Sequence, residues 1–486
     1  MTSWAIAPAV RRRRLDAALL AGPLTVGALA GVRIKYAVLA VIAIGVIGWV
    51  MARPAVAAYL LIFLTPLVVG LNDAAVVHAL RPNETLMIVL GVAIGLRWLT
   101  RVRSGEVKWP RLDGADASLI TLAVASSVLP LVVMAVRQRA IMTDDLLYSI
   151  VLWKLVAEYV IVRAAITTRE QAMRCLKLSL LAAAVVCAIG ILQSLGHFGV
   201  TGLLAKYYTP TGIDTALTNG RGGSLLGLPA AVADLAILNL AIAVAMIVRG
   251  HRRPLWLGSL AVLYGLGVVA AAEFSTFIGL FVSLAALMVI TKSGRIAAYT
   301  IPVALLGGTL LWPVIRTRLA GFDSATGLPI SWTDRLYNLR TYFWPVVSSD
   351  HNWILGVRPA ARIPLTSKRF SYVWIESGYM WLLWGGGLPL LASYLAFVGA
   401  FVRKGWAHIR RADAAGIAAT AVVTALCAQA VLMLLDPHLT YRGSGDVLFL
   451  ILALVRRLPG GRTKVTGGDQ PASAALTVSA PAEIPT

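Results

Sequence analysis

The sequence predicts an all-α, polytopic membrane protein of about 12 to 14 transmembrane helices, with one long external loop before the last few. Composition is the first reason, because 58% of the 486 residues are hydrophobic and only 14% are charged. The second reason is that the apolar residues form repeated runs long enough to cross a bilayer, such as "SLLAAAVVCAIGILQSL" from Ser179. The strands of a membrane β-barrel would instead alternate between apolar and polar residues.

The apolar runs define the expected transmembrane domain, 1–458, and its spans. The first two spans and the last are short or irregular. The tail 459–486 is rich in Gly, Ala, Ser, Thr and Pro, and we expect it to be disordered in the cytoplasm. The expected spans are 17–32, 36–52, 54–71, 83–98, 116–136, 146–166, 177–196, 225–248, 255–271, 275–291, 297–315, 376–401, 415–435 and 445–456.

Positive charge predicts the orientation. An even number of spans puts both termini on one side, and the run "RRRR" at 11–14 makes that side the cytoplasm. With these spans, 27 Lys and Arg residues lie inside and 16 lie outside. The net charge of +22 is therefore ascribed to cytoplasmic Lys and Arg beside membrane lipids, and no nucleic-acid partner is expected. The expected location is the cytoplasmic (inner) membrane.

Two external loops depart from this simple sorting. The loop 316–375 contains eight of the external Lys and Arg residues and only three acids. Orientation does not explain this excess, whereas an anionic ligand on the outer face does. The loop 197–224 is smaller and carries Lys206 and Arg221.

The stretch "WTDRLYNLRTYFWP", 332–345, predicts a short amphipathic helix on the outer membrane surface. Arg335 lies on its polar side, whereas Arg340 lies nearer its apolar stripe. Lipid head groups are the alternative partners of both arginines. The apolar stripe consists of Leu336, Leu339 and Phe343, and the polar stripe of Arg335, Asn338 and Tyr342.

Two further segments have residue types suited to an anionic substrate. In "NGRGGSLLGLP", 219–229, glycines permit close backbone approach and Arg221 offers a donor fork for phosphate oxygens. The alternative is a flexible loop before a helix. Glu376 lies where the long loop re-enters the membrane, so partial desolvation would raise its pKa and suit it to act as a general base. The alternative for Glu376 is a helix-dipole partner.

Other polar residues are weaker candidates. Lys154 and Glu158 are four residues apart in one span and are expected to pair with each other. Asp234 and Glu273 are expected to support helix packing. The three cysteines have no disulfide or ligand spacing, and neither a metal nor another cofactor is expected. His351 is a secondary candidate base, and Arg442 or His438 is a candidate for lining a cavity.

Three segments carry a resemblance to a known family. "GRGGSLLGLP" resembles an Arg-Gly segment that opens a central span, and "DRLYNLRTYFWPVVSSDHNWILGVRP" resembles an arginine followed by an aromatic-rich surface helix. "ESGYMWLLWGGGLPLLASYL" resembles a closing segment in which a polar residue precedes a Gly-rich helix. In this order and layout, the chain resembles the O-antigen ligase and polymerase superfamily of bacterial membrane glycosyltransferases, with a GT-C-type fold.

The resemblance implies a substrate and roles for particular residues. The substrate would be a glycan on a polyprenyl diphosphate, transferred at the outer face to a glycan or lipid acceptor. Arg221, Arg335, Arg340 and Arg358 would hold the diphosphate. Tyr342 is a secondary candidate that is suited to stacking on a sugar ring, with a place in an interfacial aromatic belt as the alternative. Ligases of the family usually carry a histidine where this chain has Glu376, so the chain resembles the polymerase branch more. A flippase and a chain-length regulator are candidate partners.

Two other functional classes remain open from the sequence. A transporter or flippase of lipid-linked sugars would concentrate charge near the bilayer midplane and often shows repeated halves. Here the unpaired charge is expected outside, and no repeat is visible in the sequence. A non-catalytic scaffold of an envelope assembly would leave the external arginines and Glu376 without a role.

Overall fold

The computed structural model describes residues 34–71, 80–105, 112–208, 220–251, 253–294, 305, 307–324, 327–364 and 372–459. The expected span 17–32 lies outside the described residues. So do nearly all of the tail 459–486, about half of the expected span 297–315, and parts of both external loops.

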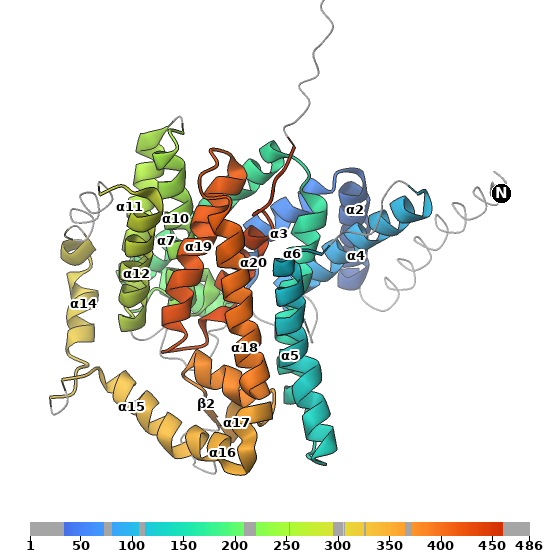
Figure 1. The fold of residues 1–486 in the computed structure, drawn as a ribbon. Coiled ribbons are helices and arrows are strands. Elements are labelled where there is room, and N and C mark those ends of the chain that lie inside the picture. Colours follow the sequence, from blue (N-terminus) through green and yellow to red (C-terminus); the bar gives the residue numbers. More distant parts are fainter. Residues whose placement is uncertain are drawn as a thin grey trace, which may run out of the picture.

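Long apolar helices form the body of the molecule, and the prediction of an all-α polytopic membrane protein is confirmed (Figure 1). In the described part of the chain, eight helices are long and apolar enough to cross a membrane. They are α4 (Pro82–Arg103), α5 (Gly114–Val136), α7 (Arg169–Ser194), α10 (Pro229–Val248), α11 (Pro254–Ala271), α12 (Phe274–Thr291), α18 (Gly378–Trp406) and α19 (Ala414–Leu432).

Four other helices complete the bundle: α2 (Ile34–Ala52), α3 (Ala55–Val68), α6 (Thr143–Ala165) and α20 (Ser444–Leu452). Helix α10 is apolar except for Asp234 and Asn239, and it packs against α7, α11, α12 and α19, which explains its central position. Short elements connect the bundle helices. They are α8 (Val200–Tyr207), η2 (Ser224–Leu226), α14 (Trp312–Leu319), α15 (Ile330–Asn338), η3 (Leu339–Phe343), α16 (Trp344–Ser348), η4 (Ser349–His351), α17 (Asn352–Leu355) and η5 (His438–Thr440).

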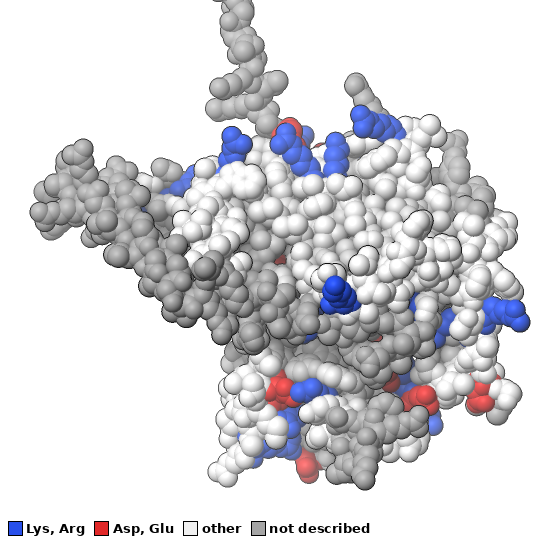
Figure 2. Space-filling model, turned by 180° about the vertical axis from the view of Figure 1, so that it is seen from behind, with Lys and Arg blue, Asp and Glu red and all other residues white. Residues whose placement is uncertain are grey.

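The surface charges divide between the two ends of the bundle. Figure 2 shows mainly Lys and Arg at the upper end, a largely white middle with few basic side chains, and mixed acidic and basic side chains at the lower end. Large apolar side chains such as Ile42, Val132 and Phe281 are exposed on the bundle helices. An apolar exterior of this kind is expected where helices face lipid.

From α14, which stands at the left of the view, the chain continues to α15, α16 and α17, which run beneath the bundle toward the lower part of α18 (Figure 1). The expected amphipathic helix is divided into α15, a π-helical turn η3 and α16. The sequence stretch ends at Pro345, where a proline would be expected to stop the helix, but the helix continues. Pro345 lies in the first turn of α16, where its missing N–H removes no helical hydrogen bond. Phe343 and Val347 are buried and fasten this segment to the bundle.

A break inside α18 receives the end of this segment. Gly387 has φ 65° and ψ −154°, and Pro389 follows two residues later. At this break the Trp384 carbonyl accepts a hydrogen bond of 2.7 Å from the Val357 N–H of the loop, in place of a donor from its own helix. Irregular backbone inside a membrane protein needs such replacement partners. The loop then forms a short antiparallel pair, β1 (Arg362–Pro364) with β2 (Tyr372–Trp374), and enters α18.

We expect Gly387→Ala to destabilise the protein. Its positive φ disfavours any side chain, and a Cβ there would lie 2.4 Å from the Ile354 carbonyl oxygen. Strain of this kind costs roughly 1–3 kcal/mol, so the thermal unfolding temperature in detergent should fall. Gly399→Ala is the matched control, because a Cβ at Gly399 in the same helix meets nothing within 4 Å. Equal unfolding temperatures for the two variants would contradict this role of the break.

Candidate functional site

Arg335 is the centre of a charged cluster at the lower end of the bundle. Its Nη2 lies 2.7 Å from Asp436 Oδ2, and its Nε lies 3.9 Å from Glu376 Oε1. The side chain is only 20% exposed. Burial alone would lower the pKa of this guanidinium, but Asp436 and Glu376 outweigh that effect and raise it. Arg335 is therefore a permanent cation held by two carboxylates from other parts of the chain.

The start of α18 and the loop after α19 bring the two carboxylates together. The Tyr379 N–H donates a 3.1 Å hydrogen bond to the Met433 carbonyl. Gly378 permits this approach, because a Cβ there would lie 2.4 Å from the Met433 sulfur. Glu376 lies just before Gly378, and Asp436 lies just after Met433. The contact therefore brings both carboxyl groups to the same arginine.

Burial tunes both carboxyls toward proton uptake. It raises the pKa of Glu376 although Arg335 and a hydrogen bond with Asn338 oppose the shift. It also raises the pKa of Asp436 to about 7, against the effect of Arg335 and His438. Each carboxyl can therefore exchange a proton closer to neutral pH than an exposed carboxyl would.

Arg221 enters the cluster from the segment ahead of α10. Its Nη1 lies 3.8 Å from Glu273 Oε1, in the turn between α11 and α12. The next residue, Gly222, packs against α7, where a Cβ would lie 2.7 Å from the Gly190 carbonyl oxygen. Its N–H donates to the Ala270 carbonyl at the end of α11. Close backbone packing thus sets the direction of Arg221.

Arg318 of α14 is the third arginine of the cluster. Burial and repulsion by Arg221 and Arg335 lower its pKa to about 10, although Glu273 opposes this shift. The guanidinium also lies over the Phe274 ring, 5.5 Å from its centroid. Within the described residues, Arg318 forms no ion pair, so its charge is less compensated than those of Arg221 and Arg335.

The arginines leave hydrogen-bonding capacity unused inside the cluster. Nε of Arg221 and Nε of Arg318 are both buried and have no partner within the described part of the chain. Buried donors without partners are unusual and call for an explanation. An anion with several oxygens, such as a phosphate or diphosphate, would satisfy both donors and relieve the repulsion among the three guanidinium groups.

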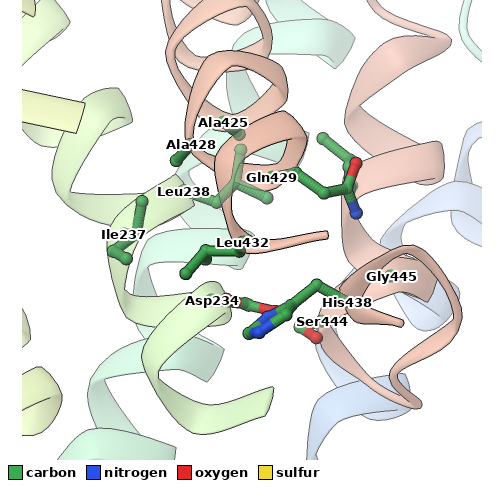
Figure 3. Close-up of a pocket in the computed structure, with 11 residues that line it drawn as sticks. Asp234, Ile237, Leu238, Ala425, Ala428, Gln429, Leu432, His438, Ser444 and Gly445 are labelled. Carbon is green, nitrogen blue, oxygen red and sulfur yellow. The ribbon is translucent and has the colours of Figure 1, made fainter. Parts of the chain in front are cut away.

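Near the carboxyl group of Asp436, the buried His438 pairs with Asp234 of α10. His438 Nδ1 lies 2.8 Å from Asp234 Oδ2, and these groups line a cavity of about 30 Å³ between α10, α19 and α20 (Figure 3). Burial opposes protonation of the imidazole, but Asp234 outweighs it and raises the pKa of His438. His438 Nε2 is buried and has no partner among the described residues, and the cavity is large enough for about one water molecule.

The structure brings some of the predicted site residues together and separates others. Arg221, Arg335 and Glu376 lie in the cluster. Arg358 instead forms a two-pronged ion pair with Asp145 at the start of α6, with Nε at 2.9 Å and Nη2 at 2.5 Å. This pair fastens the loop to the bundle.

The remaining candidates are not joined to the cluster by any ion pair or hydrogen bond among the described residues. Arg340, His351 and Arg442 are exposed, and His351 has a left-handed backbone with φ 56°. Tyr342 is half-buried and its ring contacts Tyr337 edge to face.

Four cluster residues were not among the predicted site residues, and each had only a faint signal in the sequence. Arg318 was merely one of eight positive residues in its loop. Asp436 lies in "DPH", a polar break directly after an apolar run, which marks a loop but no partner. Asp234 and Glu273 were expected to support helix packing. The structure instead links them to the site, through His438 and Arg221 respectively.

Comparison of the chain with family models, curated proteins and solved structures finds no significant match. The functional interpretation therefore depends on the site itself.

We expect the cluster to bind anions through Arg318. Inorganic diphosphate should raise the thermal unfolding temperature of the purified protein, and Arg318→Gln should weaken the apparent affinity roughly tenfold, as expected for a lost hydrogen bond to a charged group. The control is Arg340→Gln, which removes an exposed arginine of the neighbouring segment. An equal loss of affinity in both variants would argue for non-specific charge attraction.

Proposed function

We propose that the protein is a membrane glycosyltransferase that transfers or polymerises a polyprenyl-diphosphate-linked oligosaccharide at the outer face of the cytoplasmic membrane. In this proposal it acts as a surface-polysaccharide polymerase or ligase. Arg221, Arg318 and Arg335 hold the diphosphate, and Glu376 accepts the proton of the acceptor hydroxyl. No metal takes part in the step.

The observation that carries this proposal is the convergence of three arginines beside a partly desolvated carboxyl group. The arginines come from separate segments, and two of them retain buried donors without partners. Glu376 lies 3.9 Å from Arg335, so a base adjoins the proposed diphosphate site. A phosphoryl leaving group and a nearby proton acceptor are the two requirements of this reaction.

In the proposed step the acceptor hydroxyl oxygen attacks the anomeric carbon of the lipid-linked sugar. A new C–O bond forms while the bond from that carbon to the diphosphate oxygen breaks. Glu376 takes the hydroxyl proton, and the electron pair of the broken bond leaves with the polyprenyl diphosphate. The arginines stabilise the negative charge that develops on this leaving group.

We expect Glu376→Gln and Arg335→Ala each to abolish glycan extension, because the first removes the proton acceptor and the second a diphosphate contact. Purified protein with lipid-linked repeat units in detergent would be assayed for longer lipid-linked chains. The same variants would be compared in cells through the length distribution of the surface glycan.

Asp350→Asn and Arg340→Ala are the matched controls, because both residues are exposed in the same loop. Both controls should extend chains normally. Full-length polymer from Glu376→Gln and Arg335→Ala, with both proteins inserted and folded, would show the catalytic assignment to be wrong.

Diphosphate binding should strengthen as the pH falls through about 7. Below this pH, Asp436 is neutral and releases Arg335, whereas above it the carboxylate competes with the ligand. The probe is a short-chain prenyl diphosphate sugar, whose diester phosphates keep their charge over this range. Linkage to one proton changes affinity by at most about tenfold per pH unit.

Asp436→Asn should flatten this pH dependence and hold the affinity near its low-pH level, whereas Asp350→Asn should leave it unchanged. Equilibrium binding measured from about pH 6 to about pH 8 tests both expectations. A wild-type affinity that is constant or that falls on acidification would contradict the competition between Asp436 and the ligand.

A transporter or flippase of lipid-linked sugars is the second candidate. It is favoured by a buried ion pair inside the bundle, Lys154 Nζ to Asp446 Oδ1 at 2.7 Å, since intramembrane charges often serve transport. The detergent assay distinguishes the two functions. Chain growth in detergent, without a second compartment, supports transfer, whereas movement of the substrate across a vesicle wall without chain growth supports transport.

A further inference from the structure

A second group of charged side chains lies inside the bundle, between α6 and α20. The sequence spacing predicted that Lys154 pairs with Glu158. In the structure Lys154 pairs with Asp446 instead, so that prediction was wrong. Glu158 is fully buried and the Asp446 side chain is 1% exposed. None of the roles proposed above for the arginine cluster uses these residues.

If both carboxyl groups are ionised, the hydrogen-bond acceptors of this group outnumber its donors. Asp446 Oδ1 receives Lys154, and Asp446 Oδ2 accepts a 2.8 Å hydrogen bond from the Gly443 N–H. Among the described residues Glu158 receives no donor on either oxygen, although it lies one helical turn from Lys154 on α6 and its carboxyl interacts with the Asp446 carboxyl. Two ionised carboxylates cannot hydrogen-bond to each other, because both are only acceptors.

The surrounding helices offer Glu158 no second cation among the described residues. Glu84 of α4 is the other charged side chain nearby, and it accepts from the Arg81 N–H at the start of its own helix. Helices α3 and α19, which pack on α20, carry no charged residue. The charged residue of α10, Asp234, pairs with His438, and Asp116 of α5 pairs with Arg163.

One additional proton would satisfy the whole arrangement. A protonated Glu158 donates its O–H to the Asp446 carboxylate, and Lys154 and Asp446 then form a neutral pair. Without that proton, the group carries an uncompensated negative charge in an apolar interior, which is strongly unfavourable. Lys154 already neutralises Asp446, so the single charge that remains to be compensated fits a proton.

We propose that Glu158 and Asp446 form an intramembrane proton-binding site, and that the bound proton holds the start of α20 against α6. Asp446 lies in the first turn of α20, directly after the loop that carries Asp436 and His438. Release of the proton therefore loosens the helix that anchors one side of the arginine cluster. The inference concerns the folded protein and holds whichever of the two candidate functions is correct.

Infrared spectroscopy of the purified protein tests the proton directly. At about pH 8, where an exposed carboxyl is ionised, the wild type should show the C=O stretching band of a buried protonated carboxylic acid. Glu158→Gln should remove that band, whereas Glu84→Gln, which neutralises the neighbouring acid, should retain it. Absence of the band in the wild type, or its persistence in Glu158→Gln, would overturn the proposal.

Thermal unfolding provides a second measurement that does not depend on enzymatic activity. The folded protein holds a proton that an unfolded Glu158 releases, so wild-type stability should fall as the pH rises above the ordinary range of carboxyl titration. Glu158→Gln should lose this part of the pH dependence, because its amide N–H replaces the acid O–H at every pH. An unchanged pH dependence in that variant, with Glu84→Gln matching the wild type, would also overturn the proposal.

Discussion

The ion pair between Arg335 and Asp436 joins the segment beneath the bundle to the transmembrane helices. Its two residues are about a hundred positions apart, and both are mostly buried. Removing Arg335 would leave the buried carboxyl of Asp436 without its ion-pair partner. The docking of α15, the start of α18 and the loop after α19 must therefore all be correct before this pair can form. The position of Glu376 depends on the same three segments.

The break at Gly387 makes that docking compatible with a membrane. A continuous α18 would have no free carbonyl for the loop, and a side chain at Gly387 would collide with the Ile354 carbonyl. The Val357 N–H of the loop donates to the Trp384 carbonyl, in place of a donor from the helix itself. The ion pair of Arg358 with Asp145 fastens the same loop to α6. One backbone interruption thus positions the segment from which Arg335 reaches the site.

The arginine cluster has an excess of hydrogen-bond donors, whereas the charged group between α6 and α20 has an excess of acceptors. At the arginine cluster, guanidinium donors exceed the partners that reach them, and an anion would complete the set. Between α6 and α20, carboxyl groups exceed the donors, and a proton would complete the set. The loop from Met433 to Gly443 connects the two groups. Asp436 in this loop belongs to the arginine cluster, and Asp446 lies in the first turn of α20, which follows the loop. The same electrostatic requirement therefore operates at both places.

The sequence by itself determined that the chain is helical and membrane-spanning, because burial in lipid requires long, continuous apolar runs and those runs are visible without any structure. It also singled out Arg221, Arg335 and Glu376, since charged residues at the edges of apolar runs stand out. Only the tertiary structure decided which charges meet. Arg318 and Asp436 belong to the arginine cluster, whereas Arg358 pairs with Asp145. Lys154 pairs with Asp446 and not with Glu158 of its own helix. Apolar periodicity specifies each helix but not its neighbours, so long-range ion pairs depend on packing that the pattern does not record.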